Sequence, residues 1–231
     1  MKLVFLKTIA LLFVFAFSST HVLGQKKAKL TPETKEDLKT AKVLLVRYQA
    51  PPLSFMTPKD AVGAGLIADL TKSDIAENRE AHRYYPEERI QKNLAQLLQE
   101  SNLMNSIEVR EEASEFMMPA KLKDVAKYSD VDADYIMEVI VPLMGWRATY
   151  APLKWQTYHL NLALEVRIIR KSDLARVWKT NVGYGGLTDK EMRFHITELE
   201  ENGKELIDTK INTLALEASK KVLEKFIKAK K

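Results

Sequence analysis

The fold of this chain is decided by the stretch YHLNLALEVRI at residues 158–168. Apolar side chains occupy every second position of this stretch, and the positions between them include His159, Glu165 and Arg167. Because successive side chains of a strand point to opposite faces, the alternation predicts a long β-strand with one buried face and one face in water.

The segments around this strand complete a sheet. Residues 171–173 predict a turn and residues 175–182 predict the returning strand of a long antiparallel hairpin. Short apolar runs at residues 43–48 and 134–141 predict strands that are buried on both faces, and residues 107–110 predict a further short strand.

Helical periodicity accounts for much of the rest. Ile90, Leu94, Leu97 and Leu98 predict one apolar helix face, and apolar residues from 207 to 226 mark one stripe of a long C-terminal helix. Further helices are expected at residues 60–82 and 121–128, with a short exposed one at residues 33–39. The expected fold is α/β (α+β): a single mixed β-sheet with a long antiparallel hairpin, covered by amphipathic helices including a long C-terminal helix.

The N-terminus predicts export. Lys2 and Lys7 precede an apolar run of residues 8–17, and Val22-Leu23-Gly24 offers a cleavage site. This order of charged, apolar and small-residue regions is typical of a secretory signal peptide. We therefore expect a signal peptide at residues 1–24, an exposed segment at 25–41 and one domain at 42–231, in a periplasmic or secreted protein with no transmembrane span in its mature form.

Composition excludes several functions. The net charge is only +5, which gives no case for nucleic acid binding. The chain has no cysteine, so a thiol nucleophile and a cysteine-bound metal are excluded.

No motif indicates catalysis or a cofactor. The mature histidines, His82, His159 and His195, are far apart in sequence and lack the spacing of a helical zinc site. The alternating aspartates of residues 130–134 lack the glycine and distal glutamate of a calcium loop, so turn formation is the better interpretation. We expect no metal and no cofactor, although carboxylates that the fold brings together stay open as a catalytic pair.

Residues 144–155 are the most suggestive segment for binding. They join two predicted strands and contain aromatic and basic side chains of the kinds that dominate binding energy. The glycine-rich stretch at residues 183–186 is expected nearby through the hairpin. The candidate binding residues are Trp146, Arg147, Tyr150, Trp155 and Tyr184, with the alternative that the tryptophans simply fill the end of the core.

The order of elements resembles the α/β domain of CsgG, LpoB and the N-terminal domain of TolB. The matching residues are 43–48, 90–98, 133–136 and 177–178, and the resemblance spans residues 42–228. It implies an envelope protein that binds other proteins or assembles, without enzyme activity. The lipid-anchored members carry an N-terminal cysteine, so their anchoring does not transfer to this chain, and residues 50–85 exceed what the pattern needs.

These observations favour an exported, non-enzymatic binding or assembly module with a protein or cell-envelope partner. The alternative is a secreted hydrolase that acts on a glycan or peptide through paired carboxylates. The sequence leaves the oligomeric state open.

Overall fold

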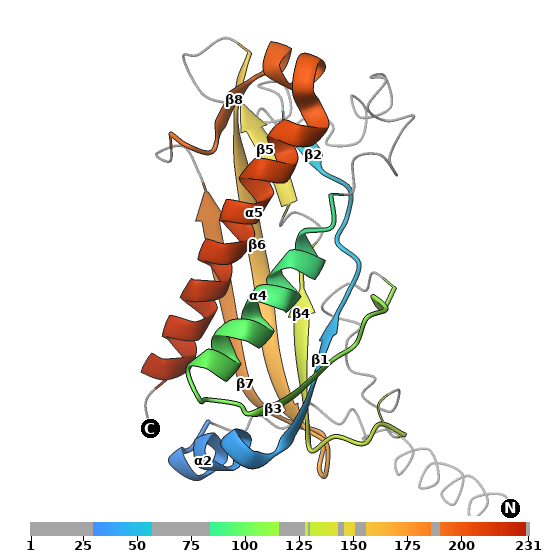
Figure 1. Ribbon diagram of the computed structural model, residues 1–231, viewed down its shortest axis with the longest axis vertical. Coiled ribbons are helices and arrows are strands. Elements are labelled where there is room, and N and C mark those ends of the chain that lie inside the picture. The colour runs from blue at the N-terminus through green and yellow to red at the C-terminus, as the bar shows by residue number, and fades with distance from the viewer. Residues whose placement is uncertain are drawn as a thin grey trace, which may run out of the picture.

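The computed structural model of the chain describes residues 30–56, 84–115, 128, 130–142, 146–150, 156–185 and 190–229. Within these ranges an eight-stranded mixed sheet runs along the molecule, and helices α4 (Pro86–Glu100) and α5 (Ile196–Lys228) cover one of its faces (Figure 1). The expected mixed sheet with a long C-terminal helix is confirmed.

Strand β6 (Thr157–Arg170) is the spine of this sheet. Its C-terminal half pairs with β4 (Tyr135–Ile140) and its N-terminal half pairs with β5 (Trp146–Tyr150), both antiparallel. Strands β7 (Ala175–Gly185) and β8 (Arg193–His195) pair with its other edge, so the expected β6–β7 hairpin is confirmed. Parallel strands complete the sheet: β1 (Lys42–Arg47) beside β4, β2 (Ser54–Met56) beside β5, and β3 (Ser106–Val109) beside β1.

The sheet is interrupted at one level, which we call the waist. The β4 ladder ends where Ile140 meets Glu165, and the β5 ladder begins where Trp146 meets Leu162. The break between β1 and β2 is at the corresponding place, so among the described strands β6 and its hairpin partner β7 cross the waist, with β1, β3 and β4 at one end of the sheet and β2, β5 and β8 at the other (Figure 1).

Prolines lie in both breaks. Pro51 and Pro52 separate β1 from β2, and Pro142 follows β4. Since proline has no N–H to give to a ladder, strand pairing stops readily at these positions. Residues 54–56 and 146–150, for which the sequence predicts no strand, form β2 and β5.

The helix-covered face holds the main core. Ile90, Leu94 and Leu98 of α4 are fully buried against it, as their spacing predicts. The apolar stripe of α5 packs over β6 and β7, and its buried members include Ile207, Leu214, Ala218, Val222 and Phe226. Burial of these side chains supplies the main favourable term in folding.

Helix α2 (Pro32–Thr40) closes the end of the molecule where α5 finishes (Figure 1). Thr31 caps it through its side chain, and proline occupies the first helical position. The expectation that this helix is wholly exposed is wrong, because Leu38 is fully buried. Lys35 also donates to the carbonyl oxygens of Ile227 and Ala229, at 3.1 and 2.7 Å, which ties α2 to the end of α5.

The opposite face of the sheet is not in water as the sequence suggested. His159, Glu165 and Arg167 of β6 are only 2%, 7% and 4% exposed. We call this the polar face. The helix expected at residues 60–82 lies outside the described residues, as does most of the one expected at residues 121–128.

Two glycines of β7 give a matched test of this register. Gly185 has a φ of +86°, and a Cβ there would lie 2.3 Å from the carbonyl oxygen of Leu160, whereas a Cβ at Gly183 would meet nothing within 4 Å. Gly185→Ala is therefore expected to lower the free energy of unfolding by about 1–3 kcal/mol, measured by denaturant titration. Gly183→Ala is the control, and equal losses from both would contradict the register.

Candidate functional site

The polar face carries a buried charge network centred on β6. Arg167 donates from Nε to Oε1 of Glu165, and Lys179 of β7 lies 2.6 Å from Oε2 of the same carboxylate. The side-chain amide of Asn181, oriented with its nitrogen toward the carboxylate, donates to Oε2 at 3.1 Å. Glu165 is therefore bound on both oxygens by groups from its own sheet.

A second carboxylate lies one row further along the same face. Glu138 of β4 is 1% exposed and pairs across the ladder with Arg167. Its Oε1 accepts from the hydroxyls of Tyr48 and Tyr128, at 2.7 and 3.0 Å, and the two hydroxyls are 2.9 Å apart. Burial, and then the Glu138 charge, raises the pKa of both tyrosines, so both hydroxyls stay protonated as donors.

Sequence reasoning missed this cluster, although a signal was present. Glu138 interrupts an otherwise apolar run, and a glutamate in a strand buried on both faces requires a partner. Both buried carboxylates bind neighbours within the fold, Glu165 through both oxygens and Glu138 through Oε1. The hydrolase alternative stays a prediction.

A groove of about 360 Å³ opens on the polar face at the waist. Ala163 and Gly183 are the smallest residues that line it, Glu165 and Asn181 flank them, and Pro142 lies where β4 has ended. Because a Cβ at Gly183 would meet nothing, the groove is open above the backbone of β7.

Four of the five predicted binding residues lie in described strands. Trp146, Arg147 and Tyr150 belong to β5, and the register puts Trp146 and Tyr184 on either side of Leu162. The predicted proximity of the two segments is thereby confirmed.

Tyr184 is half-buried beneath α5, with the ammonium of Lys221 4.4 Å from its ring centroid, a cation–π contact. Trp155 lies outside the described residues. The role of all five as binding residues stays a prediction.

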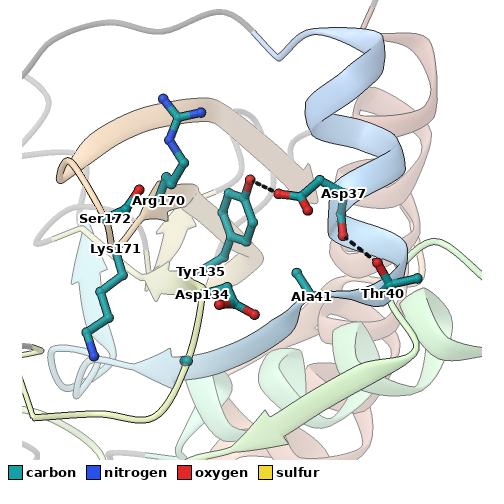
Figure 2. Close-up of a pocket in the computed structure, with 9 residues that line it drawn as sticks. Asp37, Thr40, Ala41, Asp134, Tyr135, Arg170, Lys171 and Ser172 are labelled. Atoms are coloured by element: carbon teal, nitrogen blue, oxygen red, sulfur yellow. Dashed lines mark hydrogen bonds between the residues drawn. The ribbon is translucent and has the colours of Figure 1, made fainter.

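A larger pocket of about 570 Å³ lies between α2 and the β6–β7 turn (Figure 2). Tyr135 donates to Asp37 at 2.5 Å across it, and burial, with this bond, raises the pKa of Tyr135 to about 12. Asp134 accepts from the backbone of Lys42 at 2.9 Å, and Arg170, which lines the pocket, is ion-paired with Asp173 of the β6–β7 turn. Its charged groups are thus engaged in holding α2 and the turn to the sheet.

Across the described ranges, no group of three His, Cys, Asp or Glu side chains is placed to hold a metal ion. None of the helices described is both long enough and apolar enough to cross a membrane.

No protein-family model matches the chain, and no curated protein matches it. Similar solved structures include a DUF330 protein from Xanthomonas campestris, with TM-score 0.43 and 10% identity over 88% of this chain and 92% of that chain. PelC from Paraburkholderia phytofirmans, a dodecamer, has a TM-score of 0.38 and 12% identity over 80% of this chain and 87% of that chain. Lipoprotein GNA1162 from Neisseria meningitidis has a TM-score of 0.27 and 10% identity over 73% of this chain and 96% of that chain.

Likenesses of this size say what the chain is similar to and carry no conclusion about its family or function. The resemblance to CsgG, LpoB and TolB stays a prediction.

The polar face generates a stability prediction. Arg167→Met leaves Glu165 and Glu138 buried without this cation, so we expect a loss of about 3–5 kcal/mol in the free energy of unfolding. The double variant Arg167→Met/Glu165→Leu removes the opposing charge as well and is expected to be more stable than the single variant. Chemical denaturation measures both, and a harmless single change would contradict the network.

A separate buried cluster joins β1 to α4 on the helix-covered face. Arg47 donates to Gln91 at 2.5 Å and to the carbonyl oxygen of Arg110 at 3.2 Å, and Gln91 donates to that of Leu45 at 2.8 Å. Glu87, in the first turn of α4, is 2% exposed. Burial raises its pKa, against the opposing effect of its backbone hydrogen bonds.

The raised pKa of Glu87 predicts a pH dependence. The folded state holds this proton more tightly than the unfolded chain, so stability falls as pH rises from the usual glutamate pKa through the raised one. Glu87→Gln is expected to raise the melting temperature near neutral pH and to flatten this fall. Glu88→Gln is the control, because the bond to Lys92 lowers the pKa of Glu88 and reverses the sign. A lower melting temperature for Glu87→Gln at neutral pH would contradict the assignment.

Proposed function

We propose that this chain is an exported, non-enzymatic binding or assembly module that engages a protein or cell-envelope partner through the waist of its sheet. The observation that carries the proposal is the register of the waist. It sets β5, with Trp146 and Arg147, and the glycine-flanked Tyr184 of β7 at one level on the two sides of β6.

The position of Trp146 and Arg147 in a strand supports this proposal better than a position in a loop would. Residues in a hydrogen-bonded ladder have fixed backbones, so less conformational entropy is lost when a partner binds. In the ladder Arg147 lies opposite Asn161. The groove begins at Ala163, the next residue of β6 on the same face.

The N-terminal sequence supports export. The charged, apolar and small-residue regions of residues 1–24 have the order of a signal peptide, and we propose that the mature chain begins at Gln25. A partner would then be met outside the cytoplasm.

Capture from an envelope extract tests this function. The tagged mature chain is the bait, and mass spectrometry identifies what it retains. Trp146→Ala/Arg147→Ala is expected to abolish retention of a reproducible protein partner, because aromatic and arginine anchors supply most binding energy.

The matched control is Leu216→Ala/Lys220→Ala, an apolar and basic pair exposed on α5. It should retain the partner, and thermal melts should show both variants folded. Retention by the Trp146/Arg147 variant would overturn the proposed surface. Release of soluble fragments from purified peptidoglycan by the bait, with no protein partner, would favour the hydrolase alternative.

A further inference from the structure

We propose that the waist groove, with a lysine rim along β7, is a docking site for an acidic polypeptide segment of the partner. This inference rests on the proposed function and specifies the chemistry of the partner. The groove is defined above by Ala163, Gly183 and the residues around them. The rim consists of Lys221 and Lys225 of α5.

The rim lysines are held at the groove by its own backbone. Lys221 donates to the carbonyl oxygen of Gly183 at 3.2 Å, and Lys225 donates to that of Asn181 at 2.6 Å. Both acceptor residues line the groove. Two cations from α5 are therefore fixed at the edge of β7, whose backbone borders the groove.

The positive charge beside the groove is only partly offset, by the carboxylate of Glu224, whose pKa is lowered by its hydrogen bond to Lys228 and also by the Lys221 charge. Among the described ion pairs, neither Lys221 nor Lys225 meets a carboxylate within 4 Å, whereas Lys220 and Lys228 of the same helix pair with Glu217 and Glu224. The one carboxylate in the groove, Glu165, already binds Arg167 and Lys179. A negatively charged ligand is the one that complements this surface.

The position of the lysines also sets the direction of approach. Their ammonium groups occupy carbonyls on the outer edge of β7, where an added strand would otherwise pair. A partner segment must therefore lie over the polar face and not extend the sheet. The open space above Gly183 is where its chain can approach closely.

Fluorescence anisotropy of a labelled oligo-glutamate peptide tests the site, with the mature full chain as receptor. We expect saturable binding that weakens with ionic strength and that labelled oligo-lysine does not show. Gly183→Leu fills the groove and should weaken binding about tenfold or more, whereas Gly183→Ala should leave it near the parent value.

A charge-matched pair of variants tests the rim. Lys221→Ala/Lys225→Ala should weaken peptide binding and reduce its salt dependence. Lys220→Ala/Lys228→Ala removes the same charge from lysines that already have carboxylate partners, and it should change binding little. Thermal melts confirm that each variant is folded.

Three results would overturn the inference: no peptide binding, equal effects of the two lysine pairs, or unchanged binding by Gly183→Leu. Competition by inorganic phosphate as strong as that by unlabelled peptide would overturn it in favour of a small-anion site. If envelope capture depends on Trp146 and Arg147 but the acidic peptide does not bind, the proposed function stands and only the ligand class fails.

Discussion

The antiparallel pairing along β6 is the interaction on which the rest of the structure depends. Strands β4 and β5 pair with one edge and β7 and β8 with the other, while β1, β2 and β3 reach it only through these neighbours. The strands break at the waist both between β1 and β2 and between β4 and β5, where Pro51, Pro52 and Pro142 interrupt strand pairing. The two ends of the sheet are therefore joined through β6, which β7 accompanies from Asn161 to Arg170. The groove opens where the β4 and β5 ladders leave out Ala163 and Leu164 on the other edge of β6.

The buried charges on the polar face fix the register of this spine. A slip of one residue would turn Glu165 and Arg167 into the apolar core beneath α4 and α5, away from Lys179 of β7 and Glu138 of β4. Tyr48 and Tyr128 specify β4 in the same way through Glu138. Such a network costs desolvation energy, and its contribution is specificity of pairing more than stability.

The regular elements could be predicted from sequence because their apolar periodicity is local: the alternation in β6 and the stripe of α5 both lie where the patterns place them. Strand β5 (Trp146–Tyr150) could not be predicted in this way, because it is defined by its pairing with residues 158–162 of β6. The burial of His159 was missed because alternation reveals two faces but not what covers the second. Arg147 could be selected from its chemistry alone, whereas the groove at Gly183 could be found only from the register of three strands.

Hydrogen–deuterium exchange along β6 tests the central claim most directly. If β6 unites the sheet, amides on both sides of Ala163 should exchange slowly, at matching rates, through global unfolding alone. The predicted single domain would then behave as one cooperative unit. Exchange of residues 157–162 by a local opening far faster than that of residues 165–170 would contradict this account, because the two ends of the sheet would then unfold independently.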